Sequence, residues 1–139
     1  MSQPIKKAVI VRLLSTIQHP NAAAETFDMK TTGELTIKGA QPYLVYEEVQ
    51  DEKAIKTTVK LNSESALIIR SGGVKMRLPF FKGELQTGSY DSGYGTMMIT
   101  TNTKQLHFKD GHFRVEYELL MNEEVVGTYT LELTYTEAK

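Results

Sequence analysis

The chain has 139 residues, 40% of them hydrophobic and 24% charged, with a net charge of -1 and an isoelectric point near 6.3. This length suits one domain spanning residues 1–139, and the near-neutral charge gives no basic footprint for nucleic acid. Cysteine is absent, which excludes disulfides, thiolate metal sites and cysteine nucleophiles and favours a reducing, cytoplasmic location.

The amino-terminal segment has the pattern of a first β-strand. Lys6 and Lys7 precede a short apolar stretch, but Arg12 interrupts it before it reaches the length of a secretory signal. No other segment approaches the roughly 20 apolar residues of a membrane helix, and the tyrosines are too scattered for the aromatic girdles of a membrane barrel. We therefore expect no membrane association.

Short alternating segments separated by turn residues follow in chain order. Alternation of apolar and polar residues with a period of two predicts strands, because successive side chains leave a strand on opposite faces. The expected strands are 7–18, 31–38, 43–50, 55–61, 66–70, 74–80, 95–102 and 105–109. Pro79 cannot donate to a ladder, so its strand should lie at an edge, be bulged or be close to its end there.

The carboxy-terminal segment 113–135 gives the strongest signal, a long hairpin. Its apolar residues occupy odd numbers on both sides of 122–124, and a three-residue loop there would pair the two apolar faces directly. Odd-numbered residues should then face inward, namely Val115, Tyr117, Leu119, Leu131 and Leu133.

The fold class that follows is all-β. A sequential meander of about 8–10 strands without helical crossovers tends to close on itself, so we predict a single antiparallel up-and-down barrel. At most one short helix is expected, in residues 20–27, where Asn21 could cap it.

Part of the chain resembles a known family. The runs Tyr43-Leu44-Val45-Tyr46-Glu47-Glu48, Thr57-Thr58-Val59-Lys60-Leu61, Leu67-Ile68-Ile69-Arg70-Ser71-Gly72, Val74-Lys75-Met76-Arg77, 90–95 and Tyr117-Glu118-Leu119 are similar in order to the YwiB-like family of Gram-positive bacteria. The family is uncharacterised, and the resemblance implies a calycin or lipocalin-like barrel without implying an activity. Gly93 and Glu123 depart from the family pattern, both at turns.

The candidate binding residues are polar side chains set among apolar strands. Arg70 ends an apolar run and needs a partner if buried, either a structural ion pair with Glu48 or Glu116 or an anionic ligand. Tyr46, Tyr90 and Tyr94 are expected with Arg70 at a barrel mouth, where they would suit a small amphipathic ligand, neutral or anionic.

The sequence gives little support for catalysis or metal binding. His107 and His112 flank a turn and read as solvated hairpin residues, as does His19 in a loop. Glu47, Glu48 and Asp51 make a weak metal set, because adjacent strand residues point to opposite faces. We expect no cofactor and no metal, and lean against an enzyme.

Two functions therefore remain open. One is a non-catalytic barrel that binds a small molecule. The other is an interaction or structural module with a filled barrel, including a homodimer. The wide side chains Phe80, Phe108, Phe113, Tyr117 and Tyr129 should fill the middle, and an interior cavity would favour the first function.

Overall fold

The computed structural model describes residues 3–50 and 52–138, and within them the chain is all β-strand, turn and loop. The described residues form no helix. The ten strands are β1 (Ile5–Gln18), β2 (Glu25–Lys38), β3 (Gln41–Gln50), β4 (Lys53–Lys60), β5 (Ser65–Gly72), β6 (Lys75–Phe81), β7 (Leu85–Asp91), β8 (Thr96–Lys109), β9 (His112–Met121) and β10 (Glu124–Glu137).

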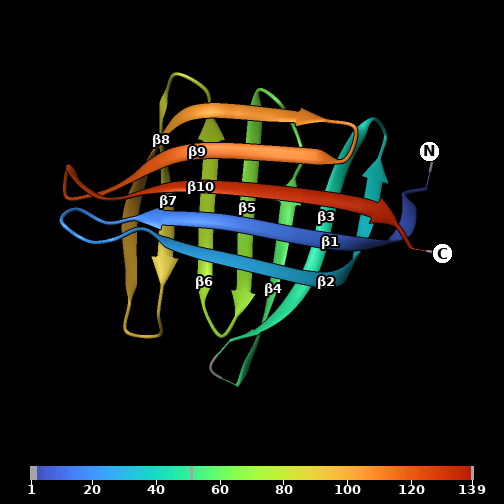
Figure 1. Cartoon of the computed structure of the whole chain (residues 1–139), viewed down its shortest axis with the longest axis horizontal. Helices are drawn as coiled ribbons and strands as arrows, with labels where there is room; N and C mark the ends of the chain where they lie inside the picture. The colour runs from blue at the N-terminus through green and yellow to red at the C-terminus, as the bar shows by residue number, and fades with distance from the viewer. Residues whose placement is uncertain (1–2, 51, 139) are drawn as a thin grey trace.

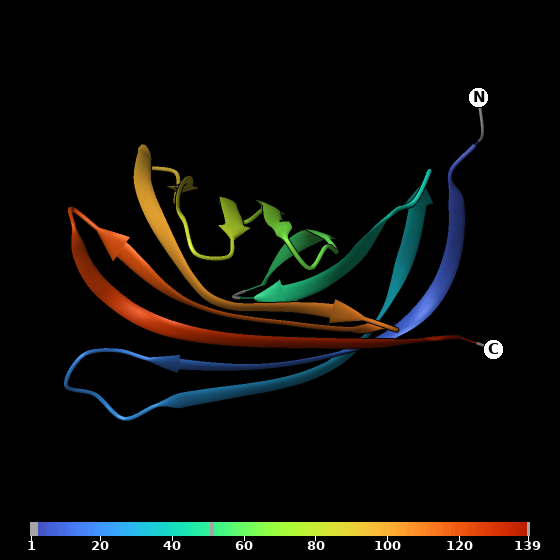
Figure 2. The same cartoon turned by 90° about the horizontal axis from the view of Figure 1, so that it is seen from above.

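The strands close into an antiparallel barrel in which each pairs with the next along the chain. β1 pairs with β10 from Val9↔Glu137 to Gln18↔Thr128, and this ladder completes the ring. In Figure 1, β10, β1 and β2 lie side by side, and Figure 2 shows the strands wrapping around the interior. The predicted up-and-down barrel is confirmed.

The prediction of at most one short helix is confirmed, but residues 20–27, the suggested place for it, form no helix. Asn21 takes a left-handed φ of 61° in the turn, and β2 already begins at Glu25. Thr26 and Phe27 pair with Thr16 and Ser15 of β1. Cross-strand pairing therefore prevails over the local capping signal.

The last hairpin keeps the predicted inward face through a different turn. Met121 pairs with Glu124, so the turn is only Asn122 and Glu123, both with positive φ, 52° and 67°. Two positive φ values characterise a tight hairpin turn whose twist matches the strands. A bulge between Val125 and Gly127 then restores odd-to-odd pairing.

The face assignment of this hairpin is confirmed. Val115, Tyr117 and Leu133 are buried, and Leu119 and Leu131 are partly buried. None of the five odd-numbered residues is exposed.

A second bulge joins two predicted strands into one. Residues 95–102 and 105–109 belong to β8, whose register shifts between Thr103 and Gln105. The extra residue changes which parity faces inward: Ile99 and Thr101 are buried before it, and Leu106 after it. This places Phe108 partly buried against the core.

One end of the barrel is filled and the other is open. The packed end lies beside the hairpins β2–β3, β4–β5, β6–β7 and β8–β9. Its largest fully buried side chains are Phe80, Phe113, Leu44, Leu61, Leu133, Val9, Val11, Val59 and Val115. The five other hairpins surround the opposite end, which we call the open end.

The barrel wall parts between β2 and β3 toward the open end. Their ladder runs only from Lys38↔Gln41 to Gly33↔Tyr46. Beyond Tyr46, β3 continues to Gln50 paired with β4, and β2 is paired with β1 as far as Glu25. We call the gap between them the wall opening.

The wall is also irregular around Pro79. β6 pairs with β7 only from Lys75↔Asp91 to Arg77↔Ser89, so Pro79 lies beyond this ladder. Its carbonyl accepts a hydrogen bond from the Thr101 hydroxyl. Pro79 pairs with Leu67 of β5, so the residue without an N–H lacks a strand partner only on the β7 side.

Candidate functional site

The open end contains a pocket of about 400 Å³ inside the barrel. Residues of most of the strands line it. They are Leu13, Ser15, Ile17, Glu25, Thr26, Phe27, Tyr46, Glu48, Thr57, Ile68, Arg70, Met76, Leu78, Tyr117, Leu119, Tyr129, Thr130 and Leu131.

Aromatic rings separate the pocket from the packed end. Tyr117 of β9 stacks on Tyr129 of β10, with centroids 5.2 Å apart and an interplanar angle of 8°. Phe80 lies against the same tyrosine at 4.7 Å and 54°. Tyr117 pairs directly with Tyr129 in the β9–β10 ladder, so the stack follows from the strand register.

A row of residues in cross-strand register crosses the wall of the pocket. Tyr46 of β3 lies opposite Thr57 of β4, and Thr57 lies opposite Arg70 of β5. Arg70 in turn faces Met76 of β6. All four side chains line the pocket, so a polar strip lies within largely apolar walls.

Arg70 forms an ion pair with Glu48 inside this pocket. Its Nη2 donates to Glu48 Oε1 at 2.8 Å, and the side chains are 25% and 14% exposed, respectively. Glu48 lies two positions beyond Tyr46, so it faces inward on the same strand. The pair is therefore largely shielded from solvent but still reached from the pocket.

Burial raises the pKa of the pocket tyrosines. It raises the pKa of Tyr46 well above its usual range. The Glu48 carboxylate raises this pKa further, whereas Arg70 and the nearby Thr57 side chain lower it. Burial likewise raises the pKa of Tyr117, and to a smaller extent that of Tyr129. These hydroxyls remain protonated at neutral pH.

Thr57 carries a hydroxyl that lies near the Tyr46 side chain but does not reach full hydrogen-bond geometry with it. The residue is 2% exposed, and its Oγ1 is buried without a hydrogen-bond partner among the described residues. Leaving a buried hydroxyl unpaired is costly. Its position between Tyr46 and Arg70 adds a third polar group to the strip.

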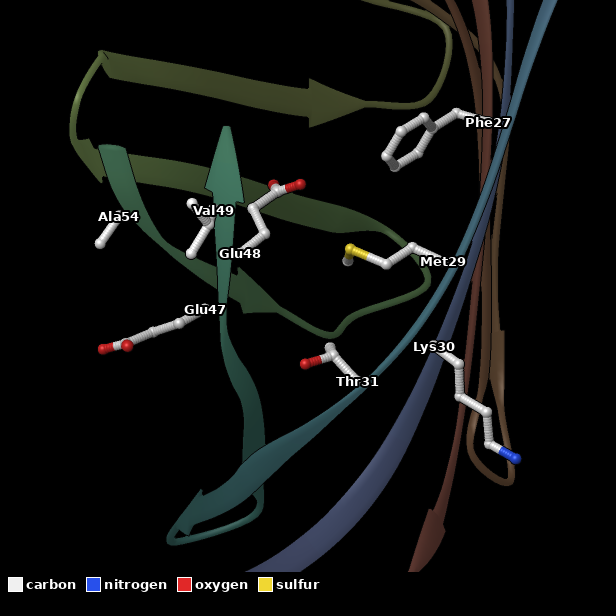
Figure 3. A pocket seen from close by; sticks show the side chains of 8 residues that line it. All are labelled: Phe27, Met29, Lys30, Thr31, Glu47, Glu48, Val49 and Ala54. Carbon is white, nitrogen blue, oxygen red and sulfur yellow. The ribbon is translucent and has the colours of Figure 1, made fainter. Parts of the chain in front are cut away.

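The wall opening forms a second pocket, of about 530 Å³. Figure 3 shows Phe27, Met29 and Thr31 of β2 pointing across it, with Glu48 and Val49 of β3 on the far side. Phe27 and Glu48 line both pockets. The interior therefore adjoins the side of the barrel as well as its open end.

Some of the expected site residues lie in the interior pocket and others do not. Tyr46 and Arg70 line the interior pocket, and Glu48, one of two expected partners, pairs with Arg70. The other partner, Glu116, stands opposite Thr130 and Gln105 in the ladders of β9. It alternates with the buried Val115 and Tyr117, so it faces outward.

Two expected tyrosines lie outside both pockets. Tyr90 pairs with Met76 and packs partly buried against the core. Tyr94 is 99% exposed in the turn between β7 and β8, where Gly93 and Gly95 have φ of 102° and 124°. The expected ring of Tyr46, Tyr90, Tyr94 and Arg70 around one mouth is therefore not assembled.

Sequence reasoning missed Thr57, Phe27 and the place of Glu48 in the pocket lining. Thr57 lies among the inward-facing residues of β4, between the buried Ile55 and Val59, and this alternation could have identified it. Phe27 could not be found, because strand β2 was expected to start only at residue 31.

The histidines lie away from these pockets. His19 Nδ1 is 3.0 Å from the carbonyl oxygen of Val126. His107 and His112 meet edge to face at 5.7 Å, and His112 Nε2 lies 3.6 Å from Glu132 Oε1.

Asp51 of the weak metal set lies outside the described residues. Among the described residues, no three His, Asp or Glu side chains form a metal-binding group. The described residues contain no helix that could cross a membrane.

The chain matches the model of the domain of unknown function DUF1934 over residues 11–133. It belongs to this family. It is 29% identical over 115 residues to the uncharacterized β-barrel protein YwiB of Bacillus subtilis (strain 168), covering 80% of the chain and 81% of that protein. The crystal structure of the Bacillus subtilis ywiB protein superposes with a TM-score of 0.75 at 25% identity, covering 94% of this chain and 93% of that one. The resemblance seen in the sequence is confirmed.

Proposed function

We propose that this barrel binds a small amphipathic molecule in the open half of its interior and does so without chemical transformation. The observation that carries the proposal is the unequal filling of the barrel. Large side chains fill the packed end, whereas about 400 Å³ remains beside Tyr46, Arg70 and the stacked tyrosines. Pockets of a few hundred cubic ångströms with apolar walls and a few polar groups are typical of small-molecule sites.

Binding without chemistry fits the state of the polar groups in the pocket. Arg70 and Glu48 form an ion pair with each other. The Tyr46 and Tyr117 hydroxyls are protonated at neutral pH, and burial raises their pKa still further. These groups suit hydrogen bonding to a ligand. A base poised to accept a proton near neutral pH would need a different environment.

A fluorescent neutral amphiphile, N-phenyl-1-naphthylamine, tests the proposal. We expect its emission to rise on binding the wild-type protein, and the rise to be lost in Leu119→Trp, which places a larger side chain among the pocket residues. Leu120→Trp is the matched control, since Leu120 is the outward neighbour on β9. No emission rise with the wild-type protein, or equal loss in both variants, would overturn the proposal.

The absence of cysteine from the sequence supports a cytoplasmic location as part of this proposal. Fractionation of cells that express the chain, with an antibody against it, tests the location directly.

A second candidate function is docking of another strand at the wall opening. From Glu25 to Thr32, the edge of β2 that faces β3 has no ladder partner in the part of the chain described. Unpaired edges accept strands of other chains, and two copies meeting there would form a homodimer. Val49 is 77% exposed at this opening.

Light scattering across a range of protein concentrations tests this second function. A dimer mass that falls to the monomer value in Val49→Lys would support it. A monomer mass at every concentration would exclude the homodimer.

A further inference from the structure

The ion pair in the pocket leaves much of its hydrogen-bonding capacity unused. Arg70 and Glu48 meet through one hydrogen bond, Nη2 to Oε1, which is the one side-chain bond of either residue within the described part of the chain. A guanidinium has five N–H donors, and a carboxylate has a second oxygen with free lone pairs. Both side chains line the pocket, so free donors and free acceptors stand together there.

The charges that line the pocket constrain what can approach this pair. Arg70 is the cation, Glu48 its counter-ion and Glu25 a further, exposed carboxylate. A ligand carboxylate at Arg70 would have to displace Glu48 or lie beside it, and either arrangement leaves a carboxylate uncompensated in a shielded place. A ligand ammonium would meet Arg70 with the same difficulty.

On this basis, and resting on the proposed function, we propose that the ligand's polar head is an uncharged group that both donates and accepts hydrogen bonds, such as a carboxamide. Its carbonyl oxygen accepts from a free N–H of Arg70, and its N–H donates to the free oxygen of Glu48. The head then completes both members of the pair without adding net charge.

The neighbouring hydroxyls fit the same kind of head. Thr57 Oγ1 is buried without a partner and lies in cross-strand register with both Tyr46 and Arg70. The hydroxyl is covered in the free protein, so a rotation of the Thr57 side chain is needed before it can pair with a carboxamide, as donor or as acceptor. The apolar body of the ligand would then extend along Ile68, Met76 and Leu119.

The test compares three probes with the same apolar body and different heads: 4-phenylbutanamide, 4-phenylbutanoate and 4-phenylbutylammonium. Binding is measured by titration calorimetry at neutral pH. For the wild-type protein we expect the amide to bind at least about tenfold more tightly than the carboxylate, because one uncompensated charge outweighs a single hydrogen bond.

Two variants should reverse the ranking of the probes. Glu48→Gln leaves the guanidinium without a counter-charge, so the carboxylate should bind more tightly than the amide. Arg70→Gln leaves Glu48 alone, so the ammonium should gain most. Asp28→Asn removes a carboxylate from an exposed pair with Arg12 on the outer face, and this control should keep the wild-type ranking.

The outcomes separate this inference from the proposed function. A wild-type protein that binds the carboxylate as tightly as the amide, or a ranking unchanged in both variants, overturns the choice of head while leaving binding in the pocket intact. Failure of all three probes to bind any of these proteins overturns both proposals. Reversal in either variant supports the inference, so one folded variant is enough.

Discussion

Gly33 and Tyr46 face each other at the last rung of the β2–β3 ladder, the point where the barrel wall parts. A Cβ on Gly33 would lie 2.7 Å from the carbonyl oxygen of Val45 and 3.0 Å from Cγ2 of Val11. Neither the backbone of Val45 nor the β-branched side chain of Val11 can easily move away from such a Cβ atom. The absence of a side chain at Gly33 thus allows the strands to meet here before they diverge.

Gly33→Ala should therefore destabilise the fold by roughly 1–3 kcal/mol, the usual cost of overpacking. Urea unfolding followed by circular dichroism measures the change. Thr32→Val, at the exposed neighbouring position, is the control and should stay within about 0.5 kcal/mol. Equal midpoints for the two variants would contradict the close approach at Gly33.

Removing Arg70 should expose the cost of a lone carboxylate. Arg70→Met strands Glu48, which is 14% exposed. Because the pair is shielded but not fully buried, we expect a loss of about 2–3 kcal/mol, below the full cost for a buried pair. In the double variant Arg70→Met with Glu48→Met, most of this loss should be recovered.

The exposed pair Arg12–Asp28 supplies the comparison, with side chains 63% and 51% exposed. Arg12→Met should change the stability little, as is usual for exposed ion pairs at the surface. A loss at Arg70 no larger than that at Arg12 would show that the inner pair is effectively solvated.

Stability should fall at alkaline pH because of the buried tyrosines. Burial raises the pKa of Tyr46 and Tyr117 in the folded state, so above about pH 10 the unfolded chain releases protons that the folded one retains. The free energy of unfolding is unaffected below that pH. Above about pH 10, each of these two tyrosines should reduce the free energy of unfolding by up to about 1.4 kcal/mol per pH unit.

Denaturation at a series of alkaline pH values measures this slope. Tyr46→Phe should make it shallower. Tyr94→Phe, at the fully exposed turn position, should leave it unchanged. A slope that is the same in all three proteins would mean that the buried hydroxyls ionise as freely as exposed ones.

Replacing Thr57 should stabilise the free protein. Thr57→Val keeps the shape and removes a buried hydroxyl that lacks a partner, so a gain of about 1 kcal/mol is expected. Thr36→Val is the comparison. The Thr36 hydroxyl donates a hydrogen bond to Glu34 at 3.3 Å, so this variant should be less stable than the wild-type protein. A loss at Thr57 would show that its hydroxyl is satisfied in solution.

The sequence predicted the strand pattern well because alternation records which face each side chain takes. It also contained the information to choose between the two partners of Arg70: with Tyr117 inward, its neighbour Glu116 had to face outward. The bulges at Lys104 and Val126 were not predictable, since they depend on the register of two strands. The same holds for the wall opening, which arises from residues of β2 and β3 that do not pair.

Tyr94 shows a different limit. Its glycine neighbours indicated a turn, and an aromatic residue in a turn suggested a lining role. The positive φ angles of Gly93 and Gly95 instead carry it into solvent. Composition alone does not tell in which direction a loop projects.

Closure of the ring through β1 and β10 has a consequence for the order of folding. The ladder joins Val9 to Glu137, so its first strand lacks a partner on one side until almost all of the chain has been synthesised. Contacts this distant in sequence are slow to form, and open strand edges aggregate. A nascent chain that stalls before β10 would therefore be a substrate for chaperones, and refolding should be slow relative to helical domains of the same length.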